Sequence, residues 1–467
     1  MATLLSLPPE LFLEFFEHID WSDTPSSLLS IRASCRALRD VSWDAFADNY
    51  FKHRTHLVNE DSIQCLIDIS KHPHLCEAVE SLSFPITRIV ARKKDRVEGM
   101  YANQKFRRSC GKDTMLLSYA MSNLPSVTEI FIIAEEENTE EEDAEEEDTE
   151  EEEAEEEETG DKETEEELEN KEAEELRRRE NRRSGGKHRL ALALKEDNLK
   201  FNTVYRLSDA PAKEGDNHWA YTFNVISSAL SLNAIELHTF NIFIFNKAEA
   251  GLPIDCLKLP PDIQTGLSGA FFELGSLNLD LDNLGGNGFY NSYPILTNFD
   301  LLTQFVGLAP RLKTLCLRFQ THHGDCASLF SHMAEHLHLP ELISLELGKF
   351  SGSTDSLLKF LHKHKGVLKE VALNEFNILE EQVDDTFHST GGWMSVVRDL
   401  EEFGVSFLIL KDCLVNAQFI LFKQEDGTVE ESFALESYTD ALKQSPEGYR
   451  RRLKAIQGTR TEPNFHY

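Results

Sequence analysis

Seven side chains between positions 322 and 338 are of the types that bind zinc or take part in acid–base catalysis. His332 and His336 are four residues apart, so on a helix they would share one face, as zinc ligands do. The segment reads His-Met-Ala-Glu-His, whereas a zinc protease needs His-Glu-x-x-His. We therefore interpret the cluster as polar residues on an outer helix and predict no metal site. The seven residues are His322, His323, Asp325, Cys326, His332, His336 and His338.

Other candidate chemistry lacks its sequence context. Cys316 has no base near it in the sequence, so the pattern of a nucleophilic cysteine is incomplete. Residues 285–288, Gly-Gly-Asn-Gly, lack the strand-to-helix setting of a nucleotide-binding loop. The sequence predicts a protein that is not an enzyme and needs no cofactor. A hydrolase that uses the histidine cluster is the weakest alternative.

The N-terminus carries more apolar surface than a small bundle can bury. Pro8 fits the first turn of a helix over 7–19, and the apolar residues of that helix cover about half of its circumference. Two further short helices follow, one at 28–31 and one through 38–46, and a polar connector is expected over 51–58. Domains below about 60 residues bury too little surface alone, so the surplus must face a partner.

The residues of this segment resemble an F-box. The resemblance rests on Leu-Pro-x-Glu-Leu at 7–11, Leu-Leu-x-Ile-Arg at 28–32 and Ser-Cys-Arg-x-Leu-Arg at 34–39. It implies docking on the Skp-type adaptor subunit of an SCF ubiquitin ligase and, through it, on a cullin-RING ligase. The alternative is an unrelated helical hairpin that packs on its own domain. The residues expected at the adaptor face or supporting it are Leu7, Pro8, Leu11, Phe15, Ile19, Leu28, Ile31 and Cys35.

A helix followed by a Leu-x-x-Leu-x-Leu strand recurs along most of the chain. One such unit leaves its flanks open, so neighbouring units must stack to form a continuous core. The alternative is an ordinary α/β domain with leucine-rich buried parallel strands. The copies, with Val, Ile or Phe allowed, are 79/82/84, 127/130/132, 232/235/237, 274/277/279, 312/315/317, 342/345/347, 368/371/373 and 405/408/410.

These units resemble degenerate leucine-rich repeats, and with the N-terminus they resemble the fungal kind of F-box leucine-rich-repeat protein. The fold predicted is α/β: a three-helix F-box followed by an irregular solenoid. The resemblance implies a substrate adaptor whose solenoid presents a protein target for ubiquitination. Strand residues between the inward leucines face away from them. The candidate target contacts are therefore Ser276, Asn278, Asp280, Cys316, Arg318, Ser344, Glu346, Glu370 and Asn374.

An acidic segment at 135–175 dominates the charge of the chain. It holds 28 acidic residues and two lysines, a net −26 of the total −35, which leaves −9 elsewhere. Such a segment cannot bury enough apolar area to order itself, so we predict a disordered insertion that turns basic at 177–189. This insertion supports an alternative function, a non-degradative scaffold whose acidic tract binds a basic partner.

The remaining features predict compartment and domain limits. The eight cysteines form no Cys-x-x-Cys pair, we see no signal peptide, and no apolar run approaches the roughly 18 residues that span a bilayer. We expect a cytoplasmic or nuclear protein with no membrane contact and no nucleic-acid ligand. The predicted domains are an F-box at 1–58, first repeats at 59–134, the insertion at 135–190, further repeats with a capping hairpin at 191–436, and a helix and tail at 437–467.

Overall fold

The protein folds into two compact units, described by a computed structural model. One unit comprises 1–126 and 135–207, and the other comprises 127–134 and 208–467. Both combine helices with parallel strands, which confirms the predicted mixed α/β class. The residues that the structure describes are 25–86, 88–89, 106, 110–134, 205–206, 218–244, 251–282, 299–319, 326–379, 391–411, 413–415, 418–423, 429–430, 432–435 and 459–460.

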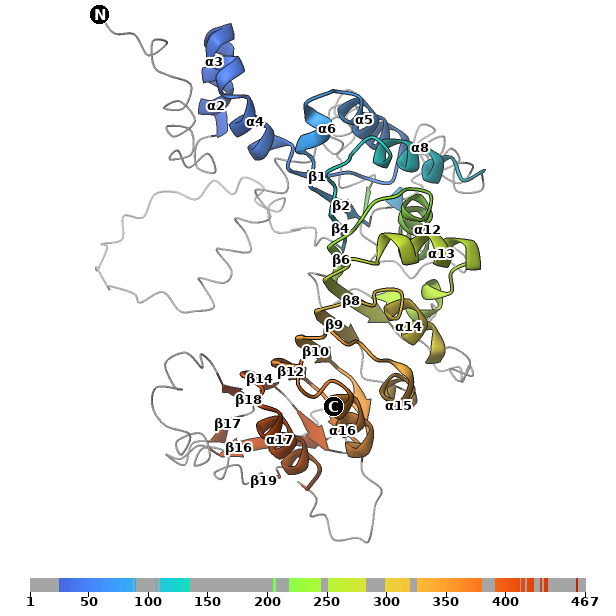
Figure 1. The fold of residues 1–467 in the computed structure, drawn as a ribbon, viewed down its shortest axis with the longest axis vertical. Helices are drawn as coiled ribbons and strands as arrows, with labels where there is room; N and C mark the ends of the chain where they lie inside the picture. Colours follow the sequence, from blue (N-terminus) through green and yellow to red (C-terminus); the bar gives the residue numbers. More distant parts are fainter. Residues whose placement is uncertain are drawn as a thin grey trace, which may run out of the picture. The chain divides into compact units, whose positions relative to one another are not determined.

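The first unit opens with three short helices, α2 (Pro25–Ser34), α3 (Arg36–Val41) and α4 (Trp43–Tyr50) (Figure 1). The sequence predicted one helix through 38–46, and the structure divides it at Ser42. The apolar spacing runs through that position without interruption, so periodicity alone does not reveal the division. The predicted helix over 7–19 lies outside the described residues.

A parallel pair of strands follows, where the sequence predicted a polar connector over 51–58. That prediction is wrong: β1 (His53–Thr55) pairs with β2 (Ser81–Pro85), and Arg54, Thr55 and His56 are buried. Some of their polar groups have backbone partners: Arg54 NH1 donates to the Tyr50 carbonyl at 2.8 Å, and His56 Nδ1 lies 3.1 Å from the Ser62 carbonyl oxygen. A polar composition therefore does not exclude a buried strand.

Helices pack beside this strand pair. Asn59 caps the first of them, because its Oδ1 accepts from the Ser62 N–H at 2.9 Å. Lys112 Nζ lies 2.8 Å from Glu60 Oε1 and joins two of these helices. The helices are α5 (Glu60–Ser70), α6 (Leu75–Ala78) and α8 (Lys112–Met121), and a separate strand pair is β3 (Arg88–Ile89) with β5 (Tyr205–Arg206).

The second unit is built on a sheet whose parallel strands follow chain order. In spatial order they are β4 (Glu129–Ala134), β6 (Thr239–Ile244), β8 (Ser276–Asp282), β9 (Thr314–Phe319), β10 (Ser344–Gly348), β12 (Glu370–Asn374) and β14 (Phe407–Lys411). The antiparallel strand β18 (Ser432–Leu435) ends this order beside β14.

Helices connect most of these strands, and Figure 1 shows α12 to α16 along one side of them. Because each crossover returns the chain to a parallel neighbour, the helices fall on the same face of the sheet. They are α12 (His218–Ser231), α13 (Pro261–Ala270), α14 (Phe299–Val306), α15 (Cys326–His336), α16 (Thr354–Lys363) and α17 (Gly391–Phe403).

The leucines of the strands form a continuous core beneath the helices. Leu277, Leu315, Leu345, Val371 and Leu408 align across neighbouring strands, and all are buried. Burial of one such side chain is worth about 1.5–3 kcal/mol relative to an exposed one. The strands therefore hold the helices through one shared apolar layer.

The third copy of the pattern is misplaced in the sequence prediction. Leu232 is 66% exposed just past α12, whereas Leu237, Phe240 and Ile242 are fully buried. The true spacing is 237/240/242, five residues later than predicted. Leu232 fits the spacing by chance because apolar residues also occur at the end of the helix.

Phenylalanines fill the corners after the strands. Phe319, Phe350 and Phe376 are buried, and Phe319 and Phe350 have ring centroids 4.8 Å apart. Left-handed backbone at Lys349 and Glu375 turns the chain there, with φ of 55° and 52°. The corners lead into a second sheet made of β11 (Ser351–Gly352), β13 (Asn377–Ile378), β15 (Leu414–Val415), β16 (Gln418–Lys423), β17 (Val429–Glu430) and β19 (Thr459–Arg460).

Several predicted segments lie outside the described residues. These are the acidic insertion at 135–175, the basic run at 177–189 and the C-terminal helix at 438–456. Among the residues that are described, no helix combines the length and the apolar character needed to cross a bilayer.

Two small elements complete the second unit, β7 (Leu252–Pro253) and the 3-10 turn η3 (Ile254–Leu257).

Candidate functional site

Helices α2 to α4 form a bundle with a very small core. Leu28 is fully buried at its centre, and the apolar side chains around it are only partly buried. Leu29, the next residue, keeps 48% of its surface exposed. The residues packed around Leu28 are Ile31, Leu38, Val41, Ala45, Phe46 and Tyr50.

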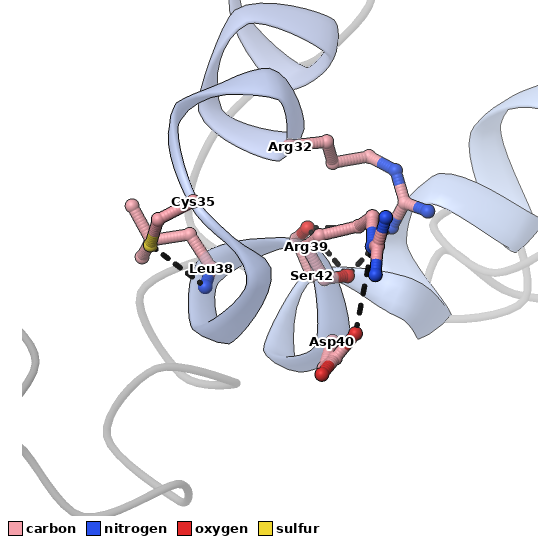
Figure 2. Close-up of polar contacts among 6 residues, drawn as sticks. All are labelled: Arg32, Cys35, Leu38, Arg39, Asp40 and Ser42. Carbon is pink, nitrogen blue, oxygen red and sulfur yellow. Dashed lines mark hydrogen bonds and ion pairs between the residues drawn. The ribbon is translucent and has the colours of Figure 1, made fainter.

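Polar and cation–π contacts of Arg32 hold the three helices together, and Figure 2 shows the polar ones. Its NH1 donates to the Arg39 carbonyl at 2.9 Å and lies 3.4 Å from Ser42 Oγ. Its guanidinium carbon lies 3.9 Å from the ring centroid of Phe46 and 5.1 Å from that of Trp43. Burial and the neighbouring Arg39 lower the pKa of Arg32, but a guanidinium stays charged at any physiological pH.

Cys35 caps the N-terminus of α3. Its Sγ accepts from the Leu38 N–H at 3.5 Å, as an N-cap side chain does. Nearby, Arg39 Nε lies 3.6 Å from Asp40 Oδ1, and both contacts appear in Figure 2. Cys35 therefore supports the helix junction from a half-buried position.

The structure assigns different positions to the residues predicted for adaptor docking. Leu28 lies in the core, so it can support a docking face but does not itself contact a partner. Ile31 and Cys35 are half-buried. Leu29 is the exposed apolar residue that the prediction missed, although it belongs to the same Leu-Leu pair. The others lie outside the described residues: Leu7, Pro8, Leu11, Phe15 and Ile19.

The predicted target contacts lie together on one face of the second unit. Strand pairing places Asn278 opposite Cys316 and Cys316 opposite Glu346, and it places Asp280 opposite Arg318. These positions alternate with the buried leucines, so they face away from the leucine layer. We call this set the strand face: Asn241, Ser276, Asn278, Asp280, Cys316, Arg318, Ser344, Glu346, Glu370 and Asn374.

An ion-pair network occupies the middle of the strand face. Arg318 Nε donates to Glu346 Oε1 at 2.9 Å, and its NH1 lies 3.9 Å from Asp280 Oδ1. Asn374 Nδ2 also donates to Glu346 Oε1, at 3.1 Å. Asp280 Oδ2 accepts from the Ile244 N–H at 2.7 Å, which ties the ends of β6 and β8 together. One guanidinium thus serves two carboxylates.

Burial determines the protonation chemistry of this network. It raises the pKa of Asp280 to about 6, although the Ile244 N–H and Arg318 oppose the rise. Burial also raises the pKa of the Cys316 thiol, so Cys316 is a poor nucleophile. Burial lowers the pKa of Arg318, but the hydrogen bond to Glu346 and the surrounding negative charge outweigh it and raise the pKa overall.

Three buried oxygens of the strand face have no hydrogen-bond partner. They are Oδ1 of Asn241, Asn278 and Asp280. A buried acceptor left without a partner costs about 1–3 kcal/mol, so such groups need an explanation. The sequence prediction missed Asn241 because it placed the third strand pattern five residues too early. Alignment on Leu237, Phe240 and Ile242 puts Asn241 in the row of Asn278.

The remaining predicted contacts surround the network. Ser276 and Ser344 are half-buried at the start of their strands, and Glu370 is exposed. Strand pairing aligns all three through Thr314 in one row across β8, β9, β10 and β12. The strand face is therefore mixed in polarity, with negative charge in excess.

The structure describes four residues of the histidine cluster, and these four do not converge on one point. The rings of His332 and His336 are 4.4 Å apart on α15, while His338 stacks on His364 at 5.9 Å. Cys326 is buried in the same helix. Among the described residues, no group of three or more His, Cys, Asp or Glu could hold a metal ion. His322, His323 and Asp325 lie outside those residues.

Comparison with known proteins adds no assignment. No family model matches the chain, and no curated protein matches it.

Proposed function

We propose that this chain is a substrate adaptor of an SCF ubiquitin ligase. In this proposal α2 to α4, together with the segment at 7–19, are an F-box that docks on a Skp-type subunit. The strand–helix units of the second unit are degenerate leucine-rich repeats, and their strand face holds a protein target. The chain does no bond chemistry itself. It raises the effective concentration of the target near the ubiquitin carrier.

The observation that carries the docking proposal is the poor burial of the N-terminal bundle. Only Leu28 and Ala47 are buried apolar residues among positions 28–50, while Leu29 is about half exposed. An apolar bundle of this size gains stability when a partner covers its surface. The motifs at 7–11, 28–32 and 34–39 favour a Skp-type subunit as that partner.

The target-holding part of the proposal rests on the arrangement of the strands. Parallel strands in register place one residue from each strand in a continuous row. A row of this kind presents mixed polar groups over several repeats, as extended binding surfaces of repeat proteins do. The second unit therefore has a surface suited to a protein segment rather than to a small molecule.

Affinity purification of the tagged full chain, followed by mass spectrometry, tests the adaptor proposal. We expect a Skp-type subunit and a cullin to co-purify. Leu29→Asp removes an exposed apolar contact and places a charge in the docking face, so we expect recovery of both to fall at least about tenfold. Phe272→Asp is the matched control, because Phe272 is 54% exposed in the second unit. Equal recovery with Leu29→Asp would contradict the proposed docking face.

A further inference from the structure

The strand face offers more hydrogen-bond acceptors than donors. Arg318 is the only cation among the residues of the strand face, and it is shared between Asp280 and Glu346. Asn374 uses its amide nitrogen on the same Glu346 oxygen. With one guanidinium and two carboxylates, the network carries one net negative charge when both acids are ionised.

Unpartnered acceptors adjoin this negative charge. Asn241 and Asn278 pair directly across β6 and β8, and Oδ1 of each is buried without a hydrogen-bond partner. Oδ1 of Asp280, which lies two residues after Asn278 on β8, is also buried without a hydrogen-bond partner. Asn241 is 7% exposed and Asp280 is 2% exposed, so these acceptors lie at the base of the strand face. Three acceptors on two neighbouring strands thus lack donors.

A guanidinium group has the chemistry that these acceptors lack. It carries a positive charge and five N–H donors in one plane, and it accepts no hydrogen bond. An ammonium group has three donors at a single point and matches acceptors on separate side chains less well. An anionic group would meet the excess negative charge of the network.

We propose that the strand face binds an arginine side chain of the target protein, with its guanidinium beside Asn241, Asn278, Asp280 and Glu346. This inference rests on the proposed function, in which the strand face holds a protein target. The target segment reaches the acceptors from the exposed side of the network. There the side chains of Arg318 and Glu346 keep 39% and 28% of their surface exposed.

Protonation of Asp280 links binding to pH. The charged or titratable groups that act on this carboxyl are Arg318, Glu346 and Cys316, and burial holds its pKa at about 6. A bound guanidinium favours the ionised carboxylate and lowers that pKa. By linkage, binding weakens as the pH falls through about 6, because the proton then competes with the arginine.

Selection from a random peptide library displayed on phage tests this proposal with the full chain as bait. The library is first depleted on the full-length Asp280→Asn/Glu346→Gln variant. That variant keeps the acidic insertion, so peptides that bind the insertion are removed. Both substitutions retain an oxygen acceptor for the Ile244 N–H and for Arg318, which leaves the hydrogen bonds of the network in place.

We expect the peptides retained by the wild-type chain to be enriched in arginine. A synthetic peptide from this set should lose at least about tenfold in affinity when its arginine is replaced by citrulline, which keeps the shape but not the charge. The same loss is expected with Asp280→Asn/Glu346→Gln, and a weaker loss on lowering the pH from about 7.5 to 5. Glu335→Gln/Glu402→Gln makes the same charge change on the helices and should leave the affinity unchanged.

Two results would overturn the proposal: retained peptides without arginine enrichment, or citrulline peptides that bind as well as arginine peptides. Capture of the Skp-type subunit, measured on the same proteins, separates this inference from the proposed function. Intact Skp capture without arginine selection refutes only the arginine site. Arginine selection without Skp capture refutes the ligase adaptor and leaves the arginine site standing.

Discussion

Asp280 is an acid whose ionisation opposes folding. Burial raises its pKa to about 6 in the folded chain, so the folded state binds the proton more tightly than the unfolded state. The contribution of the protonated Asp280 to the free energy of unfolding is complete below about pH 4, and it is lost as the pH rises through about 6. Relative to Asp280→Asn, we expect the wild-type chain to lose about 2 kcal/mol of unfolding free energy between pH 4.5 and 8. Urea denaturation at the two pH values measures this difference.

The exposed Asp355 on α16 provides the control. Asp355→Asn makes the same substitution at an exposed position and should leave the pH dependence of the wild-type chain as it is. If Asp280→Asn and the wild-type chain differ by the same amount at both pH values, Asp280 is not desolvated as described.

His56 makes the opposite contribution in the first unit. Burial, and next the charge of Arg54, lower its pKa to about 3. Its contribution to stability is therefore present above about pH 6.5 and is lost as the pH falls toward 3. We expect the unfolding free energy of the first unit to fall by about 2 kcal/mol from pH 7 to 5. Hydrogen exchange of amides 57–70, corrected for intrinsic rates, measures this fall.

The variant His56→Gln should remove most of that pH dependence, although the substitution itself lowers stability at pH 7. His336→Gln changes an exposed histidine and should leave the pH dependence as it is. A wild-type chain whose protection over 57–70 is constant from pH 7 to 5 would show that His56 protonates without cost.

At the scale of elements, the crossing of α12 and α13 depends on a glycine. A Cβ on Gly266 would stand 2.3 Å from the Ser231 carbonyl oxygen, whereas a Cβ on Gly269 meets nothing within 4 Å. Alanine favours a helix over glycine by about 1 kcal/mol at either position. At Gly266 the clash with backbone outweighs this gain, so we expect Gly266→Ala to destabilise by about 1–3 kcal/mol.

Gly269→Ala is the matched control in the same helix. It should stabilise the second unit by about 0.5–1 kcal/mol, because it gains helix propensity without a clash. Thermal unfolding of the two variants shows whether each substitution raises or lowers the stability of the second unit. Stabilisation by both substitutions would show that α12 and α13 are farther apart than described.

The strands of the second unit were predictable because one physical rule repeats. A buried leucine layer requires Leu-x-x-Leu-x-Leu. In the copies that begin at 274, 312, 342, 368 and 405, the first position precedes a strand of the sheet and the other two positions lie on it, all of them buried. The same rule failed at Leu232, where a helix end supplies apolar residues at the same spacing. The rule also missed β1, because Arg54 and His56 are buried polar residues. Their hydrogen bonds to the Tyr50 and Ser62 carbonyls cannot be read from a spacing of apolar residues.

The strand face was predictable in part for the same reason. Alternation along a strand identifies which residues share a face, so Asn278, Asp280, Arg318 and Glu346 were identified as a group. Their ion pairs and the missing partners of their oxygens depend on side-chain geometry across strands 28 to 38 residues apart in sequence. Local sequence does not contain that geometry.

At the scale of the whole molecule, the acidic insertion separates an adaptor from a charge-driven scaffold. Deleting 135–175 removes 26 of the 35 net negative charges. An adaptor that docks through apolar contacts should keep its affinity for a Skp-type subunit within about twofold at about 0.1 M salt, where distant charges are screened. A scaffold that binds through the acidic tract would lose its basic partner and the salt sensitivity of binding. Titrations of both chains at low and high salt distinguish the two.

The central claim is that the N-terminal helices dock on a Skp-type subunit, and a direct titration of the two purified proteins tests it. We predict saturable binding by the full chain and a loss of at least about tenfold in affinity with Leu7→Ala/Pro8→Ala, because each buried apolar side chain contributes about 1.5–3 kcal/mol. Leu232→Ala, at an exposed leucine of the second unit, should bind as the wild-type chain does. Absence of binding, or equal binding by the Leu7→Ala/Pro8→Ala variant, would contradict the account.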